Sequence, residues 1–229
     1  MELEEIKAGK VLLIDKPLNW TSFDIVNKIR YSILKHYNIK KFKVGHAGTL
    51  DPLATGLLIV CVGKATKTID NYLGLDKEYT GSFTLGATTP SYDLETEIDK
   101  KFPTEHITEK MIFETAKNFI GKQEQIPPVF SAIKKNGKKL YEHARKGEKV
   151  EIKSRQIEIK EFEILSIEMP KVFFRVKVSK GTYIRSLAYD FGEKLNSGAY
   201  LSELRRTKIG NFNVNDAVSY KQWIDENIG

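Results

Sequence analysis

The chain has 229 residues, 41% of them hydrophobic, and its 37 Lys and Arg against 30 Asp and Glu give a net charge of +7. This length fits one large domain or two small ones, and the hydrophobic content excludes a disordered chain. No apolar run approaches the ~20 residues of a membrane-spanning helix, and the acidic residues 1–5 do not resemble a secretory signal, so we expect neither.

The cysteine and histidine content argues against disulfides and metals. The single cysteine, Cys61, lies in an apolar run, which excludes a disulfide framework and fits a reducing compartment such as the cytoplasm. One Cys and four His leave little material for a metal site, so we expect no metal and no other cofactor. The positive net charge fits nucleic acid binding, but a lysine-rich surface that favours solubility would give the same charge.

The apolar spacing predicts strands that alternate with helices. Residues 11–14 read as a buried strand, and Thr21 or Ser22 can cap a helix that places Ile25, Ile29 and Ile33 on one face. The unbroken apolar run 57–62 is typical of a central strand. The later predicted elements are a short helix at 64–73, a strand at 79–88, a helix from Thr108 that ends near Gly121, a turn at 136–137, strands at 150–167 and 172–178, and a helix at 184–195. Several strands adjoin without a helix between them, which favours an α+β fold with a mixed sheet.

A loop at 45–56 is the first candidate for chemistry. Its glycines let the backbone approach a ligand closely, and Asp51 is the only carboxylate between Asp24 and Asp70. The alternative is structural, because Asp followed by Pro and nearby glycines is also a common turn sequence.

Three further segments combine charge with aromatic side chains. Tyr183 and Arg185 fall near a predicted helix N-terminus, where anions bind, although Arg185 could be an ordinary surface residue. Tyr79 begins a strand, so it either packs there or offers a platform for a base. Residues 125–149 contain a basic turn, which is either a solvated hairpin or an arm that contacts phosphates.

Together these segments resemble the bacterial TruB-type tRNA pseudouridine(55) synthases. The matching stretches, in the family's order, are Leu-Ile-Asp-Lys-Pro at 13–17, Gly-His-Ala-Gly-Thr-Leu-Asp-Pro-Leu-Ala-Thr-Gly at 45–56, Lys-Glu-Tyr-Thr-Gly at 77–81, Ile-Pro-Pro-Val-Phe-Ser-Ala-Ile-Lys at 126–134, Gly-Thr-Tyr-Ile-Arg-Ser-Leu at 181–187 and Leu-Arg-Arg-Thr at 204–207. There are two departures: Phe130 stands where Tyr is usual, and we expect no PUA domain of the kind that commonly follows the catalytic domain, because only about a short helix's worth of residues follows Phe212.

The resemblance implies a pseudouridine synthase fold with a mixed, mostly antiparallel central sheet, as a single catalytic domain over 1–229 with an RNA-clamping loop at about 125–149. It implies that uridine 55 in the T-arm loop of tRNA is flipped out and isomerised. The implied catalytic residues are Asp51 and its partner Arg185. The residues expected to bind the substrate are His46, Tyr79, Tyr183, Leu204 and Lys16. The residues expected to bind the RNA backbone are Lys134, Lys138, Lys139, Arg145, Arg205 and Arg206.

These residue types suit the reaction. A stacked tyrosine offsets part of the cost of flipping a base, at ~1–3 kcal/mol per stacked base. A carboxylate such as Asp51 can act as nucleophile or base, and an arginine partner would hold it ionised and aimed. The sequence leaves the order of chemical steps open. It also leaves two alternatives, an RNA-binding protein without catalysis and a synthase for another RNA, and we expect a monomer.

Overall fold

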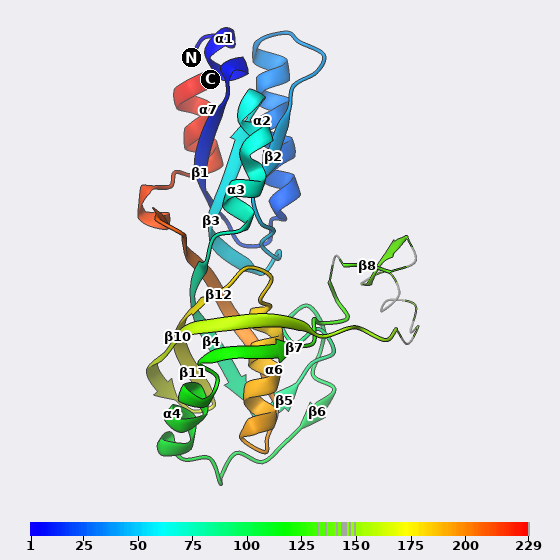
Figure 1. Cartoon of the computed structure of the whole chain (residues 1–229), viewed down its shortest axis with the longest axis vertical. Coiled ribbons are helices and arrows are strands. Elements are labelled where there is room, and N and C mark those ends of the chain that lie inside the picture. Colours follow the sequence, from blue (N-terminus) through cyan, green and yellow to red (C-terminus); the bar gives the residue numbers. More distant parts are fainter. Residues whose placement is uncertain are drawn as a thin grey trace. The chain divides into compact units, whose positions relative to one another are not determined.

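The computed structural model describes residues 1–131, 133–135, 137–140, 142, 146, 148 and 150–228, and of 134, 135, 138 and 139 only the backbone is described (Figure 1). The chain divides into two compact units: unit 1 is Met1–Tyr79 with Leu204–Gly229, and unit 2 is Thr80–Glu203. The expectation of a single catalytic domain stays a prediction. In the described part of the chain, no helix combines the length and the apolar character that crossing a membrane requires.

Unit 1 contains both ends of the chain, and the Met1 amino group donates a hydrogen bond to Asn227 O at 3.0 Å (Figure 1). Its elements are α1 (Leu3–Ala8), β1 (Lys10–Lys16), α2 (Ser22–His36), β2 (Val44–His46), β3 (Ala54–Val62), η1 (Gly63–Thr68), α3 (Ile69–Leu73), the start of β4 (Lys77–Leu85), the end of β12 (Ala199–Ile209), β13 (Phe212–Asn213), η2 (Val214–Asp216) and α7 (Tyr220–Ile228). In its sheet β1 and β2 run antiparallel to β3, and β12 runs parallel to β3 with Leu204 opposite Ala54. This parallel pairing places residues 204–206 of β12 beside the start of β3.

The burial of β3 explains its continuous apolar sequence. Leu58, Val60 and Val62 belong to a core built with α1, β1, α2 and α7, while Leu57, Ile59 and Cys61 face a second core with Ile209 and Val214. The predicted central strand is therefore confirmed, as is the burial of Cys61.

Helix α2 begins as the sequence predicts. Thr21 is its N-cap, and the Thr21 hydroxyl accepts a hydrogen bond from Asp24 N–H. The Asp24 carboxylate in turn accepts from Thr21 N–H, which completes a capping box. Ile25, Ile29 and Ile33 are fully buried on one face. This helix covers the sheet of unit 1 beside the loop that follows β2.

Unit 2 is built around aromatic side chains. Its elements are the rest of β4, β5 (Ala87–Thr88), β6 (Lys100–Lys101), α4 (Glu109–Asn118), β7 (Gly121–Gln125), β8 (Lys134–Lys135), β9 (Lys138–Lys139), β10 (Arg155–Glu168), β11 (Lys171–Val178), α6 (Ile184–Lys194) and the start of β12. Its strand order is β12–β4–β11–β10–β7, and β10 pairs antiparallel with both β11 and β7. The rings of Phe83 and Phe174 stack with centroids 4.2 Å apart, and Phe119, Phe162 and Phe191 surround them. The α+β class with a mixed sheet is confirmed.

Some predicted boundaries were wrong. Gly121 does not end a helix: α4 stops at Asn118, and Gly121 has φ +116° and opens β7, where it pairs with Ile159. The predicted helix at 64–73 is a 3-10 segment followed by the short α3, and the strand predicted from 150 begins at Arg155. The sequence patterns did not predict α1, β7 or β12, because short or partly polar elements have weak periodicity.

Candidate active site

Asp51 lies in the loop between β2 and β3, and hydrogen bonds hold the backbone of this loop on both sides of it. The Ser22 hydroxyl, buried at the start of α2, accepts from Leu50 N–H at 2.8 Å and lies 3.1 Å from Leu50 O, to which it can donate. Asp51 O accepts from Ala54 N–H at 3.0 Å. The residue before Asp51 is thus tied to α2, and the turn after it closes onto β3.

Lys16 anchors the next residue of the same loop. This side chain at the end of β1 is fully buried, and its Nζ donates to Pro17 O at 2.8 Å, Trp20 O at 2.5 Å and Pro52 O at 3.4 Å. Pro52 O also accepts from Asn19 N–H at 2.9 Å. The predicted role of Lys16 in contacting substrate stays a prediction, but its hydrogen bonds give it a supporting place beside Asp51.

The charge of Lys16 is sensitive to its surroundings. Burial lowers its pKa to about 8, because desolvation disfavours the ammonium form. The charge of Asp51 opposes this shift, and the charge of Arg206 adds to it. Asp24 opposes it weakly. Lys16 therefore responds electrostatically to both Asp51 and Arg206.

Arg206, on β12, is the second buried cation at this loop. Only 1% of its surface is exposed, and its guanidinium donates to Leu57 O at 2.8 Å, Gly48 O at 3.0 Å and Thr49 O at 3.5 Å. Each acceptor is a main-chain carbonyl on one or the other side of Asp51. This placement gives no support to the expectation that Arg206 binds the RNA backbone, since its donors point into unit 1.

His46 ends β2, next to the loop. Burial lowers the pKa of its imidazole, and the nearby Arg206 charge lowers it further, while a hydrogen bond with the Gly48 backbone acts in the opposite direction. Its Nδ1 is buried and has no hydrogen-bond partner among the described residues. The imidazole is therefore held in its neutral form near the backbone that leads to Asp51.

Tyr79 and Leu204 are brought into unit 1 by strands β4 and β12. Tyr79 is buried, with 8% of its surface exposed, and Leu204 pairs with Ala54 at the start of β3. Glu78, the neighbour of Tyr79, accepts a hydrogen bond from the Thr207 hydroxyl at 2.8 Å, which links the two strands near both residues. Asp51, Tyr79 and Leu204 thus all belong to unit 1, and their roles at a shared site stay predictions.

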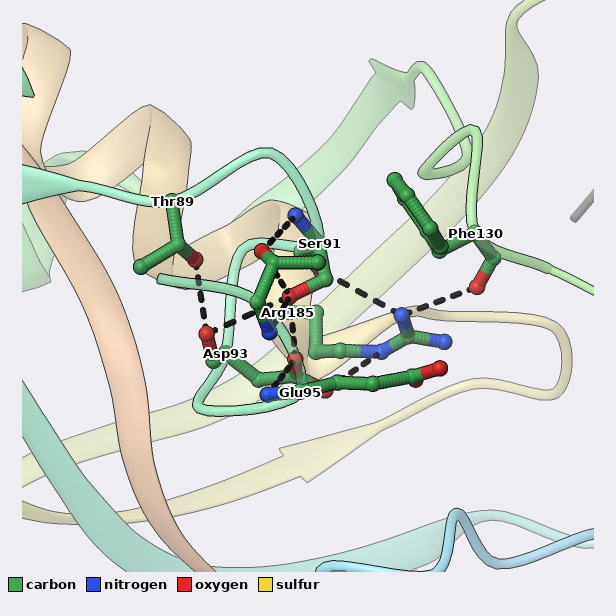
Figure 2. Close-up of polar contacts among 7 residues, drawn as sticks. Thr89, Ser91, Asp93, Glu95, Phe130 and Arg185 are labelled. Atoms are coloured by element: carbon green, nitrogen blue, oxygen red, sulfur yellow. Dashed lines mark hydrogen bonds and ion pairs between the residues drawn. The ribbon is translucent and has the colours of Figure 1, made fainter. Parts of the chain in front are cut away.

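Arg185 lies in the first turn of α6 in unit 2, and it is 4% exposed. Figure 2 shows its guanidinium between two segments: one nitrogen donates to Ser91 O at 3.3 Å and to Phe130 O at 2.9 Å. Its Nε lies 3.6 Å from an Asp93 carboxylate oxygen, in a buried ion pair. A cation in the first turn opposes the helix dipole, and the Asp93 charge compensates for this. Its predicted pairing with Asp51 would join the two units and stays a prediction.

The orientation of Asp93 is itself fixed by hydrogen bonds. Its carboxylate accepts from the Ser91 hydroxyl at 2.5 Å and from Glu95 N–H at 2.9 Å, and its carbonyl accepts from the Thr89 hydroxyl at 2.7 Å (Figure 2). The loop after β5 therefore presents the Asp93 carboxylate to Arg185 in an orientation that its hydrogen bonds fix.

Tyr183, the N-cap of α6, is held by a glutamine. The buried amide of Gln125 accepts from Tyr183 N–H at 2.8 Å and donates to Tyr183 O at 3.0 Å, as a neighbouring strand would. The Arg155 guanidinium lies 5.0 Å from the centre of the Tyr183 ring, within cation–π range. The predicted substrate-pocket residue thus has a fixed backbone and a covered ring face.

The predicted RNA-binding side chains are only partly described. Arg205 is half-exposed and forms a fork with Asp15 at 2.7 and 3.0 Å, so its guanidinium already has a carboxylate partner. Lys134, Lys138 and Lys139 lie in the β8–β9 hairpin, and their side chains fall outside the described residues. Arg145 and part of the predicted clamping loop also fall outside them.

Sequence reasoning missed several residues that position the candidate groups: Ser22, Asp93, Gln125 and the supporting place of Arg206. Each acts through a contact with a segment far away in the chain, which spacing does not reveal. Of these residues, Asp93 had a local sequence feature that could have indicated its role, since it is an acidic residue in a polar loop after a predicted strand. Among the described residues, no group of three His, Cys, Asp or Glu could hold a metal ion.

Comparison with known proteins places these features in a family. Residues 35–184 match the TruB family pseudouridylate synthase (N terminal domain), and residues 185–227 match the tRNA pseudouridylate synthase B C-terminal domain. The chain is 62% identical over 219 residues to a tRNA pseudouridine synthase B of Flavobacterium johnsoniae, with 95% of this chain and 96% of the relative covered. It is 50% identical over 221 residues to that of Chlorobaculum tepidum, with 96% and 91% covered.

Solved structures agree on the fold. A chain in a crystal structure of a Cbf5–Nop10–Gar1 complex matches with a TM-score of 0.73 and 32% identity, over 98% of this chain. A chain in an H/ACA RNP bound to a substrate RNA containing 2′-deoxyuridine matches with a TM-score of 0.69 and 29% identity. This chain spans only 56% and 59% of the lengths of those two chains. Since both family models match in sequence order and curated relatives align over nearly their whole length, the chain belongs to the TruB family of pseudouridylate synthases.

Proposed function

We propose that this chain isomerises uridine to pseudouridine at position 55 in the T-arm loop of tRNA. The observation that carries the proposal is the Asp51 loop, in which a single carboxylate sits on a backbone held at Leu50, Asp51 and Pro52. Such restraint supports a catalytic group, because a group that must meet one reacting atom works best when its orientation is preset. Relatives named tRNA pseudouridine synthase B, at 50–62% identity, supply the substrate class.

The reaction breaks the N1–C1′ bond, turns the uracil and forms a C5–C1′ bond. The C5 proton is then lost to solvent and N1 takes up a proton, so the product is an isomer of the substrate. Asp51 serves either as the nucleophile at C1′ or as the base that assists elimination there. Both routes require its ionised form, and we assign Arg185 to hold it ionised and aimed.

The uracil pocket is assigned to aromatic and apolar side chains. Tyr79 stacks on the flipped base, Tyr183 and Leu204 line the pocket, and His46 contacts the RNA as the base leaves its stack. Neutral His46 suits this position, since the buried imidazole would be costly to charge.

Binding of the tRNA backbone is assigned to basic side chains of the 125–149 segment and to Arg205. Such contacts release counterions, so affinity falls steeply as salt rises. We further propose that the protein acts as a monomer in the cytoplasm, where its tRNA substrate is found, and without a metal.

The test is tritium release from tRNA labelled at C5 of uridine, with pseudouridine mapped in a bare tRNA transcript. The wild-type chain should release tritium and modify one position in the T-arm loop, and Asp51→Asn and Asp51→Ala should each lower the rate by about 10³-fold or more while the protein stays folded. Substantial turnover by folded Asp51→Asn would contradict the assignment of Asp51 as the catalytic residue. RNA binding without tritium release would favour the non-catalytic alternative, and modification elsewhere would favour another RNA.

A further inference from the structure

Arg206 makes an unusual set of contacts for a buried charge. Its three hydrogen bonds all go to carbonyls of the segment around Asp51, and among the described residues no carboxylate lies within ion-pair distance of it. Arg205, its neighbour in the chain, instead forms a fork with Asp15. Adjacent arginines on β12 therefore have different partners: Arg205 pairs with Asp15 and donates to the Thr55 hydroxyl at 3.5 Å, whereas Arg206 donates to main-chain carbonyls on both sides of Asp51.

A buried cation without a carboxylate partner is a poor way to stabilise a fold. Desolvating a guanidinium costs several kcal/mol, and an apolar side chain of similar size often replaces a buried charge without loss of stability. The contacts of Arg206 do something an apolar side chain cannot do: they fix Gly48 O and Thr49 O before Asp51 and Leu57 O after it.

The backbone of Arg206 fixes the same loop from a second direction. Gly56 has φ +103°, and a Cβ placed there would lie 2.3 Å from Arg206 O and 2.8 Å from Arg206 N. The parallel pairing of β12 with β3 therefore leaves no room for a side chain at this point. The loop end and Arg206 are packed backbone to backbone.

We propose that Arg206 is a positioning residue of the reaction. Its guanidinium holds the segments before and after Asp51 at a fixed separation, and this orients the Asp51 carboxylate. The inference rests on the proposed role of Asp51. It assigns Arg206 to the enzyme's internal framework, in place of the RNA contact expected from its charge. After burial, the charge of Arg206 is the next cause that lowers the pKa of His46.

The experiment compares the full chain with Arg206→Met, Arg206→Lys and the control Arg30→Met. Arg30 also donates to a main-chain carbonyl of unit 1, Val44 O at 3.0 Å, and its other hydrogen bond goes to the Asn27 side chain on its own helix. Tritium release gives kcat and KM, thermal unfolding gives the folded fraction, and NMR titration follows the His46 ring.

The expected result for Arg206→Met is a fall in kcat of about 10²-fold with KM changed less than about 3-fold, because misplacing a catalytic group affects the chemical step. Arg206→Lys should recover part of kcat, since an ammonium reaches only one of the two segments. The His46 titration midpoint should rise in Arg206→Met, stay near the wild-type value in Arg206→Lys, and be unchanged in Arg30→Met.

Several results would overturn the inference. One is an active wild-type enzyme whose Arg206→Met variant keeps kcat within about 3-fold; another is a loss of activity that equals the loss of folded protein. An unchanged His46 midpoint in Arg206→Met would also overturn it. If Arg206→Met does not fold, unchanged kcat in Arg206→Lys decides against the inference. An inactive wild-type chain would instead contradict the proposed function.

Discussion

In unit 1, Asp51 lies in a loop whose carbonyls accept hydrogen bonds from two buried cations, Lys16 and Arg206. In unit 2, Arg185 lies in the first turn of α6 and is held by two carbonyls and the carboxylate of Asp93. Both units thus use main-chain carbonyls as acceptors, and in unit 2 the Asp93 carboxylate adds an ion pair with Arg185. The difference has an electrostatic consequence. The charge of Arg206 lowers the pKa of its fellow cation Lys16, whereas the Asp93 carboxylate offsets part of the charge of Arg185.

The largest expected difference between the units is in the stability that is lost when a glycine with positive φ is replaced by alanine. Gly56→Ala should lower the free energy of unfolding by about 2–5 kcal/mol, because the new Cβ meets the Arg206 backbone and the residue has a strained φ. Gly121→Ala in unit 2 is the matched control, since Gly121 also has positive φ but has nothing within 4 Å of its Cβ position. It should lose only about 1–2 kcal/mol by urea unfolding. Equal losses would contradict the close packing at Gly56.

The second expected effect is a loss of kcat when the guanidinium of Arg185 in unit 2 is replaced by an ammonium group. Arg185→Lys should lower kcat by about 10- to 100-fold, because one ammonium cannot reach Ser91 O, Phe130 O and Asp93 together, and each charge-assisted bond contributes about 1.5–3 kcal/mol. Arg175→Lys is the control, since Arg175 pairs with Glu161 and Glu163 on the surface. Tritium release measures both. Full activity of Arg185→Lys would show that charge alone suffices.

The smallest expected difference is in the pH dependence of stability, and it has opposite signs in the two units. Lys16 has a folded pKa of about 8, below its ordinary 10.5, so the unfolded chain binds more protons between these values and stability rises with pH. Burial and Glu193 raise the pKa of Asp190 to about 6 from 3.8, so the folded chain binds more protons in that window and stability falls as pH rises.

Urea unfolding of wild type, Lys16→Met and Asp190→Asn from pH 4 to 10 measures these slopes. Each group contributes at most about 1.4 kcal/mol per pH unit within its own window. Lys16→Met should remove the rise between pH 8 and 10, and Asp190→Asn should remove the fall between pH 4 and 6. Parallel curves for a variant and the wild type would show that the group titrates normally.

The predictable part of the fold has strong local signals. The continuous apolar run 57–62 and the Thr21 cap with its isoleucine stripe gave β3 and α2, and the 45–56 loop pointed to Asp51. These features depend on neighbours within one or two turns. The family resemblance added Tyr79, Tyr183 and Arg185, which spacing alone does not distinguish from packing residues.

The unpredicted part depends on partners distant in sequence. Arg206 meets Gly48 across 158 positions, and Arg185 meets Ser91 across 94. Charge and composition suggested an RNA contact for Arg206 because most arginines lie at the surface. Its burial follows from the parallel pairing of β12 with β3, and a parallel pairing is not encoded by the periodicity of either strand.

Unit 1 is discontinuous in sequence, since residues 80–203 separate its two parts. On the ribosome, Asp51 emerges long before Arg206, and α7 emerges last of all. A nascent chain therefore cannot form the hydrogen bonds between Arg206 and the Asp51 loop until β12 has left the exit tunnel. The order of synthesis thus delays assembly of the loop until almost the whole protein has been made, so incomplete translation products lack its Arg206 contacts.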